Sequence, residues 1–540
     1  MTGLALLALV FTQSDPVYRF RISIAPLPLG AIAFAAVGAV GGGSLVTDLW
    51  FALGWYSLPW GVSKALIQGI LASFLFLTIL LWLTFAFALP PRFGRTNSEK
   101  FLAAIYRGLA FGGDGALSAI AFELRRSCST IIASCNKPGN LLPGSAKSWA
   151  SKEKACAVDV LRLIADRRLC RHIVAASPGT AIGLMQEATQ QRVFRAPLGQ
   201  FSQNITIEAL KNRESPLHYE DDLSNSGLLS RIQPFTRAMY GSFELVEGSS
   251  EAMCSALDLD YRETDDLKAN EWEAYGRALT TTTADFFKSK NCDSKSYVLN
   301  RSIENIVTST NKIYMINGLS DWQLWRDEWS KLRSAMSVIE TIIRQIDENQ
   351  KTPDRKYINI EKKHYQRDFV DIICEALFEI MFNVASVKHP TDTAWSIQHN
   401  TFWTKIDRSS RNSKTWKVVN ARFSRLAIKE ISGMRKYANF RQIKIVGLLL
   451  NVFGVHEKLE NPWNSDFAFL RRYVIALTKK TYLKIVAEQP HVAEAALIGS
   501  VTFDAERKRL IKTYAQGLSF EPSREYLDLD DWDPSRGEKL

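Results

Sequence analysis

The hydrophobic pattern divides the chain into a nearly uncharged N-terminal part and a charged remainder. From Ile22 to Pro91 only two charged residues occur, Asp48 and Lys64. Within this part, Ala65–Leu89 forms a run of 25 residues without a charge. A helix that spans the hydrocarbon core of a bilayer needs about 20 mostly apolar residues. The run therefore predicts a transmembrane helix.

A second apolar run, Leu29–Thr47, is long enough to span and is rich in glycine, which is frequent in membrane helices. Small residues recur at every fourth position and would let another helix approach closely. The pattern predicts packing against the second span or, alternatively, self-association with another copy of the chain. The residues of this small-residue stripe are Ala31, Ala35, Ala39 and Gly43.

The residues that flank the two runs predict the orientation of a helical hairpin. Between the runs lie one basic residue, Lys64, and the tryptophans Trp50, Trp55 and Trp60, which favour the headgroup region. Basic residues accumulate on the cytoplasmic side of membrane proteins. We therefore predict a multi-pass protein of the inner (plasma) membrane with both termini cytoplasmic and the lipid bilayer as a partner. The flanking basic residues are Arg19, Arg21, Arg92, Arg95, Lys100 and Arg107.

Apolar positions in the charged remainder recur mostly with the period of a helix. In Asp321–Glu348, eight apolar residues are spaced alternately three and four apart, and Ser320 is available as the N-cap. This heptad pattern predicts a long helix packed within the chain or, alternatively, a coiled coil between chains. Asp368–Val387 is apolar nearly all round, which predicts a central core helix. Lys154–Ala176 predicts one amphipathic helix.

These patterns predict a mainly α fold, in which a two-helix transmembrane hairpin precedes a large cytosolic α-helical domain. Only 198–250, where short apolar runs alternate with turn residues, predicts mixed structure. The acidic C-terminal tail is expected to be disordered or loosely docked. The predicted parts are a hairpin at 1–97 with spans at 29–47 and 65–89, helical units at 98–300 and 301–520, and the tail at 521–540.

The net charge of +11 is concentrated in one segment. Thr404–Lys444 contains twelve basic residues against Asp407 and Glu430, a net charge of +10, with aromatic residues interleaved. This mixture suits nucleic acid or a nucleotide, or an anionic lipid surface. The alternative is a solvated face that the acidic tail balances. The anion-binding candidates are Lys414, Lys417, Arg422, Arg425, Lys429, Arg435 and Lys436.

Other motifs carry little chemistry. His218, Glu220, Asp221 and Asp222 are clustered, but metal ligands usually come from distant parts of a sequence, so we expect an exposed acidic turn. Gly112–Gly115 lacks the ending of a P-loop and predicts a turn. None of the seven cysteines forms C-x-x-C, so the sequence suggests neither a zinc ribbon nor a thioredoxin motif. The sequence therefore predicts no cofactor and no metal, and it yields no catalytic set.

Three classes of function remain. The first is a membrane-anchored protein, expected to be a homo-oligomer, whose cytosolic domain binds a partner or ligand as a sensor, effector or scaffold. The second is a membrane-tethered enzyme that acts on a phosphate-bearing or nucleic-acid substrate. The third is an oligomeric channel, which is disfavoured because the spans offer no charged residue to line a pore. Convergence of acidic, histidine and basic side chains in one pocket would favour the enzyme.

Overall fold

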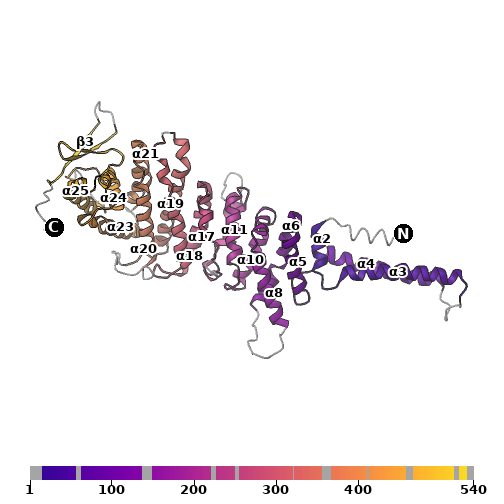
Figure 1. The fold of residues 1–540 in the computed structure, drawn as a ribbon. Helices are drawn as coiled ribbons and strands as arrows, with labels where there is room; N and C mark the ends of the chain where they lie inside the picture. The colour runs from indigo at the N-terminus through magenta and orange to yellow at the C-terminus, as the bar shows by residue number, and fades with distance from the viewer. Residues whose placement is uncertain are drawn as a thin grey trace. The chain divides into compact units, whose positions relative to one another are not determined.

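The chain is mainly helical, with three short strands near its C-terminus, and divides into two compact units, Met1–Ala256 and Leu257–Leu540 (Figure 1). The predictions for Trp60, Asp221, Asp222 and Ser320 lie outside the described residues. The computed structural model describes residues 15–55, 63–136, 149–220, 227–249, 254–319, 321–354, 367–409, 413–457, 466–515 and 522–531.

The first unit is entirely helical in its described residues except for turns and an isolated bridge. Its elements are α2 (Pro16–Ser23), α3 (Leu29–Ala52), α4 (Lys64–Leu83), the π-helix η1 (Thr84–Ala88), α5 (Ser98–Phe111), α6 (Asp114–Leu124), η2 (Arg125–Ser127), α7 (Cys128–Cys135), α8 (Trp149–Leu163), α9 (Arg167–Ala176), α10 (Pro178–Gln190), α11 (Gly199–Lys211), α12 (Pro216–Tyr219), α13 (Leu229–Ile232), α14 (Pro234–Tyr240) and α15 (Phe243–Gly248).

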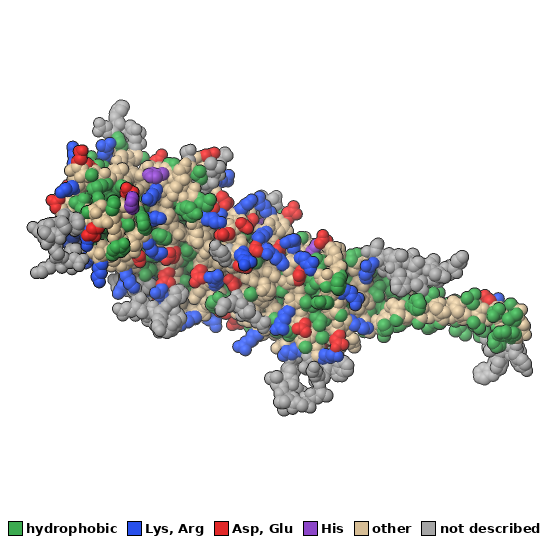
Figure 2. Space-filling view, viewed as in Figure 1, with side chains coloured by type: hydrophobic (Ala, Val, Ile, Leu, Met, Phe, Trp, Pro, Cys, Tyr) green, Lys and Arg blue, Asp and Glu red, His purple; other side chains and the backbone are tan. Residues whose placement is uncertain are grey.

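Two apolar helices, α3 and α4, form an antiparallel hairpin at the N-terminal end of this unit (Figure 1). Both are long and apolar enough to cross a membrane, and only 11% of the apolar window of each is buried within the protein. Hydrophobic side chains cover most of the visible hairpin, at the right of Figure 2. Its two charged side chains, Asp48 and Lys64, pair with each other at 2.9 Å near the turn. The predicted apolar helices are thus confirmed, and the first runs five residues further, to Ala52.

The small-residue stripe does not form the contact between α3 and α4. Ala31, Ala35 and Ala39 are exposed, and only Gly43 faces α4, where an added Cβ would lie 3.3 Å from Leu71. A helix turns about 100° per residue, so a strict four-residue spacing drifts by about 40° per step and leaves the contact face. Self-association through the three alanines stays a prediction. The buried residues of α3, which share one face, are Leu29, Ala36 and Thr47.

A buried arginine joins the hairpin to the other helices of the first unit, which are called the body of this unit below. Arg21 of α2 is 7% exposed. Its Nη1 donates to the carbonyl oxygen of Ala86 in η1 at 2.8 Å, and its Nη2 lies 2.5 Å from Oε1 of the buried Glu123 in α6. One guanidinium therefore connects α2, the end of the second apolar helix and the body.

Side chains at the start of α5 hold the segment that leads into α3. Asn97 Nδ2 donates to the carbonyl oxygen of Ile24 at 2.9 Å. Lys100 Nζ donates to the carbonyl oxygens of Ala25 and Pro26 at 3.2 and 2.7 Å. These bonds satisfy carbonyl groups that follow the end of α2 and have no helical partner. Both ends of the hairpin are therefore fixed to the same small region of the body.

The structure confirms part of the predicted turn, since Gly112 and Gly113 separate α5 from α6, whereas Asp114 and Gly115 already belong to α6. It corrects two further predictions in the first unit. Lys154–Ala176 is two helices, because the Asp166 side chain accepts hydrogen bonds from the Arg168 and Leu169 amides and caps a new helix. The described part of 198–250 is helical rather than mixed, as five helices. Most of these helices are short, and two of them begin with proline, which explains the turn-rich pattern of the sequence.

The second unit is helical and ends in a small sheet. Its elements are α16 (Tyr261–Thr264), α17 (Ala269–Ser289), α18 (Tyr297–Thr308), η3 (Ile313–Ile316), α19 (Trp322–Glu348), α20 (Phe369–Val384), α21 (Thr391–Trp395), the π-helix η5 (Ser396–Trp403), α22 (Thr404–Ser409), α23 (Lys414–Ser432), η6 (Gly433–Arg435), α24 (Phe440–Phe453), α25 (Ala468–Glu488), α26 (Pro490–Glu494), β1 (Val501–Asp504), β2 (Arg509–Thr513) and β3 (Arg524–Asp528).

The core of the second unit follows the predicted periodicity. The heptad positions of α19 from Leu332 to Ile346 are buried within the chain, against α17 and other helices, which confirms a bundle helix. At Gly276 of α17 an added Cβ would lie 2.4 Å from Val338 Cγ2, so glycine permits this close packing. α20 is buried on most sides, as predicted for a central helix. The predicted domain boundary at 300 falls inside α18.

The strands were not predicted and overturn part of the interpretation of the tail. β1, β2 and β3 form an antiparallel sheet in the order β1-β2-β3, with Leu510 opposite Leu527. Both leucines are fully buried. The acidic segment therefore contributes an edge strand at Arg524–Asp528 instead of remaining loose, because its Leu527 completes the apolar face of the sheet. Residues 532–540 lie outside the described part.

The Arg21–Glu123 pair should dominate the stability of the first unit. Glu123→Ala leaves a buried guanidinium without its carboxylate and should lower the free energy of unfolding by about 3–5 kcal/mol. The matched control is Glu99→Ala, which removes the exposed pair with Lys152 on α8 and should cost less than about 1 kcal/mol. Urea unfolding of the detergent-solubilised chain measures both. Equal effects would show that the buried pair contributes no more than a surface one.

Candidate functional site

The structure separates the seven predicted anion-binding residues into two groups. Six of them are exposed, on α23 or just after it: Lys414, Lys417, Arg425, Lys429, Arg435 and Lys436. The seventh, Arg422, is fully buried. Only the exposed six remain candidates for binding an anion from solvent.

Arg422 is a core residue, and its assignment to an anion-binding surface is wrong. Its Nη1 lies 2.5 Å from Asp368 Oδ1 and 2.8 Å from Asp371 Oδ1, both at the start of α20. Burial opposes the charge on Arg422, but the hydrogen bond to Asp368 and the charges of both aspartates keep its pKa above the usual value. The side chain falls on the face of α23 that carries Val419 and Phe423, so helical periodicity places it in the core.

Carboxylates of other helices in the second unit neutralise other basic residues of Thr404–Lys444. Lys405 pairs with Glu340 of α19 at 2.9 Å, and Arg441 pairs with Glu379 of α20 at 2.6 Å. Burial, followed by the charge of Lys388, lowers the pKa of Lys444. For Lys405 and Arg441, the balancing acids therefore come from α19 and α20.

Two of the exposed cations line a groove between α23 and the start of α25. Lys417 and Arg425 are eight residues apart, about 12 Å along the helix axis. The groove has a volume of about 500 Å³. Five of its lining residues occupy one face of α23, and two come from the chain around the start of α25. The lining residues are Lys417, Ala421, Ser424, Arg425, Ile428, Asp466 and Phe469.

The groove combines polar and apolar chemistry. The Ser424 hydroxyl is buried and has no hydrogen-bond partner among the described residues, and an unpaired buried hydroxyl costs free energy. The Phe469 ring is 64% exposed. Asp466 accepts a hydrogen bond from Asn420 Nδ2 at 3.4 Å, which holds the only lining carboxylate against α23. Such a groove suits a ligand that carries both an anionic group and an apolar or aromatic part.

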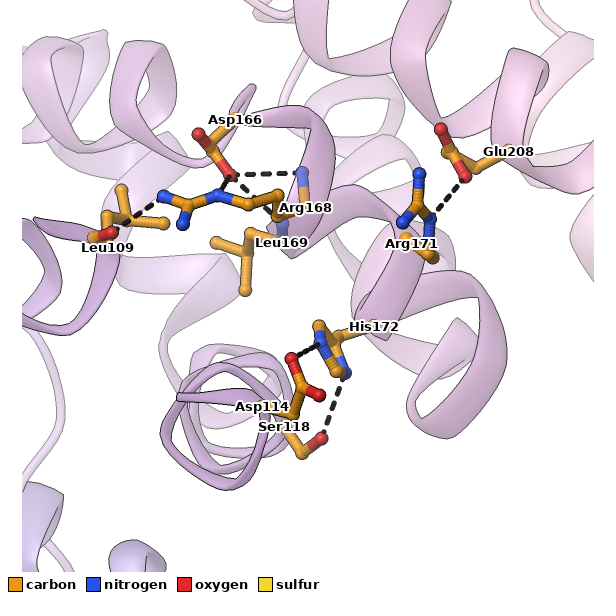
Figure 3. Close-up of polar contacts among 9 residues, drawn as sticks. All are labelled: Leu109, Asp114, Ser118, Asp166, Arg168, Leu169, Arg171, His172 and Glu208. Atoms are coloured by element: carbon orange, nitrogen blue, oxygen red, sulfur yellow. Dashed lines mark hydrogen bonds and ion pairs between the residues drawn. The ribbon is translucent and has the colours of Figure 1, made fainter. Parts of the chain in front are cut away.

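A serine, a histidine and an aspartate meet in the first unit, where the sequence gave no catalytic signal (Figure 3). His172 of α9 lies 3.1 Å from Ser118 Oγ through Nδ1, and 3.3 Å from Asp114 Oδ1 through Nε2. In serine hydrolases a buried carboxylate orients the imidazole, whereas the Asp114 side chain is 94% exposed. The cluster is therefore a polar connection between α6 and α9.

The neighbouring arginines of α9 have the same structural role, and Figure 3 draws two of them, Arg168 and Arg171. Arg168 Nη2 donates to the Leu109 carbonyl oxygen of α5 at 2.7 Å. Arg167 and Arg171 reach the two oxygens of Glu208 in α11 at 2.7 and 3.0 Å. α9 thus connects three helices through its charged face.

The predicted acidic turn at His218–Asp222 is partly wrong. Glu220 is buried, and its carboxylate accepts hydrogen bonds from the Phe235 and Thr236 amides at 2.7 and 3.0 Å. It caps α14, whose N-terminus favours a negative charge. His218 Nε2 lies 2.9 Å from the Leu210 carbonyl oxygen. Among the described residues no group of three or more His, Cys, Asp or Glu side chains could hold a metal ion.

Sequence reasoning also missed a buried lysine in the sheet. Lys512 of β2 is 1% exposed, and its Nζ donates to Asn451 Oδ1 of α24. The ammonium lies 4.7 Å from the centre of the Trp395 ring and 5.5 Å from that of Tyr514. Burial lowers the pKa of Lys512 to about 8, against the opposing charge of Glu525. The alternation of β2 would have placed Lys512 inward, had the strand been predicted.

No protein-family model, no curated protein and no solved structure matches this chain.

The stability of the second unit should depend on pH through Lys512. Its pKa is lower in the folded state, about 8, than the ordinary value of 10.5. Between these values the unfolded chain binds more protons, so folding becomes more favourable as pH rises. From pH 8 to 10.5, the free energy of unfolding of the parent protein should rise by about 3 kcal/mol relative to that of Lys512→Met. Urea unfolding across this range measures the difference, and Lys508→Met is the control at an exposed lysine. A pH-independent difference would contradict the prediction.

Proposed function

We propose that this protein is anchored in a membrane by the α3–α4 hairpin and that its second unit binds an anionic ligand in the groove between α23 and α25. The bilayer is one partner, and the ligand is an anion with an apolar or aromatic part. Both chain ends lie in the cytoplasm in this proposal. The protein acts as a sensor, effector or scaffold, without chemistry of its own.

The exposure of the two apolar helices is the observation that carries the membrane anchor. A soluble protein would bury helices of this hydropathy, because large exposed apolar surfaces promote aggregation. Here 11% of each apolar window is buried. The Asp48–Lys64 pair leaves the turn end of the hairpin without net charge, whereas Arg92, Arg95 and Arg107 are exposed at the other end. This asymmetry supports the cytoplasmic position of the body.

The groove supports ligand binding better than catalysis or ion conduction. It brings two cations, an unpaired hydroxyl and an exposed aromatic ring to one place. Among the described residues, the enzyme hypothesis has no nucleophile with an oriented base, since the carboxylate beside His172 is exposed to solvent. The channel hypothesis lacks charged residues along the hairpin apart from the pair at its turn end.

Cysteine labelling tests the anchor. All seven native cysteines are free, and six are buried, so a Cys254→Ser background removes the partly exposed one. In cells with an intact plasma membrane, an impermeant maleimide should label Trp55→Cys near the hairpin turn. It should label Lys429→Cys on α23 only after permeabilisation. Labelling of position 429 in intact cells would contradict the orientation, and release of the chain by alkaline carbonate would contradict the anchor.

Charge reversal tests the groove. Lys417→Glu with Arg425→Glu places two negative charges in it and should weaken anion binding at least about tenfold at low salt. The probes are a fluorescent single-stranded oligonucleotide, a fluorescent nucleotide and phosphatidylserine vesicles, each added to the full chain in phosphatidylcholine nanodiscs. Fluorescence anisotropy or vesicle flotation gives the affinity.

The matched control makes the same change in net charge at residues outside the groove. Arg435→Glu with Lys436→Glu reverses two exposed residues that do not line it. This pair should weaken binding much less than the groove pair. Equal weakening by the two pairs would mean that diffuse charge, and not the groove, attracts the anion.

A further inference from the structure

The helix α5 carries exposed aromatic and basic side chains close to the hairpin. It begins at Ser98, shortly after η1 ends at Ala88. Its buried face packs into the body through Phe101, Ile105 and Leu109. On its solvent side, the Phe111 ring is 84% exposed. A single exposed phenylalanine is common at protein surfaces, but this one lies on a helix whose first turn contacts the base of the hairpin.

Lys100 identifies the side of α5 that faces the base of the hairpin. Its Nζ donates to the carbonyl oxygens of Ala25 and Pro26, which lie just before α3 begins at Leu29. The direction in which Lys100 leaves α5 is therefore the direction from which the apolar helices emerge.

Helical geometry puts two more residues on that side. At about 100° per residue, Arg107 lies about 20° to one side of Lys100, and Phe111 lies about 20° to the other. Both are exposed. Tyr106 is 60% exposed, but it lies about 120° away and faces elsewhere. The three exposed side chains therefore do not form one surface, and only Arg107 and Phe111 share the direction of the hairpin.

Phe111 lies at the far end of α5 from Lys100, and therefore at a distance from the base of the hairpin. It lies about 16 Å along the axis from Lys100, more than the diameter of about 10 Å of one helix. α5 runs across the direction of α3 and α4 (Figure 1). With the hairpin inserted in a bilayer, a helix in this position lies along the surface of the membrane, with Arg107 and Phe111 toward the headgroups.

We propose that Arg107 and Phe111 form a second contact with the lipid bilayer, at the headgroup region of the cytoplasmic leaflet. The phenylalanine ring enters the boundary between headgroups and acyl chains, and the guanidinium binds lipid phosphates. The inference rests on the proposed membrane anchor and extends it. With the hairpin and α5 both attached, the first unit has one fixed tilt on the membrane.

Fluorescence quenching by lipids tests this contact in the full chain. In the Cys254→Ser background, an environment-sensitive fluorophore is attached to a single cysteine at position 76, 106 or 111. Phe76 is exposed in the middle of α4 and reports hairpin insertion. The protein is reconstituted in phosphatidylcholine vesicles, with or without phosphatidylserine. Nitroxide-labelled lipids quench the fluorophore, with the nitroxide either near the headgroup or deep in the acyl chain.

We expect the nitroxide deep in the acyl chain to quench the fluorophore at position 76, and the nitroxide near the headgroup to quench it at position 111. At position 106 we expect little quenching by either. Quenching by the shallow nitroxide should be about twofold or more stronger at 111 than at 106. Arg107→Glu should reduce shallow quenching at 111 more with phosphatidylserine present than without it.

The alternative outcomes separate the two levels of the proposal. Deep quenching at 76 with no difference between 106 and 111 would overturn the α5 contact and leave the hairpin anchor standing. Absence of quenching at 76 would overturn the anchor and the α5 contact together.

Discussion

An apolar helix that ends against a folded domain must find partners for its last carbonyl groups, which have no partner within the helix. Here the guanidinium of Arg21 donates to the Ala86 carbonyl oxygen while Glu123 neutralises its charge. Because both the charge and the donor are buried, the pair holds only if α2, η1 and α6 meet at one point. The attachment of the hairpin depends on this meeting, and the start of α5 is held to the segment before α3 by Asn97 and Lys100.

The same principle organises the charge of the second unit. In the core, Asp368 and Asp371 receive the charge of Arg422. The buried Lys512 lies instead against Asn451 Oδ1 and two aromatic rings, and burial lowers its pKa. Other cations remain on the surface, where Lys417 and Arg425 lie beside apolar side chains in a groove. The predicted anion-binding residues therefore fall into two sets: Arg422 belongs to the core, and the other six are exposed.

Several sequence predictions held because they depended on local periodicity. The apolar runs became α3 and α4, and the heptad pattern became α19. Predictions failed where a few residues decided the outcome. Asp166 capped a new helix inside a predicted continuous one, and Leu527 drew an acidic segment into a sheet. A cap or a single buried side chain changes periodicity too little to be detected.

The sequence by itself determined that the chain is mainly helical and that it has two apolar helices near its N-terminus, because burial and hydropathy follow the period of the helix. It also located the basic segment. Only the tertiary structure decided which of those basic residues are exposed, which of them share a groove with Phe469, and which residues hold the hairpin to the body. Such contacts join residues far apart in the chain, as Arg21 and Glu123 are, and no local pattern specifies them.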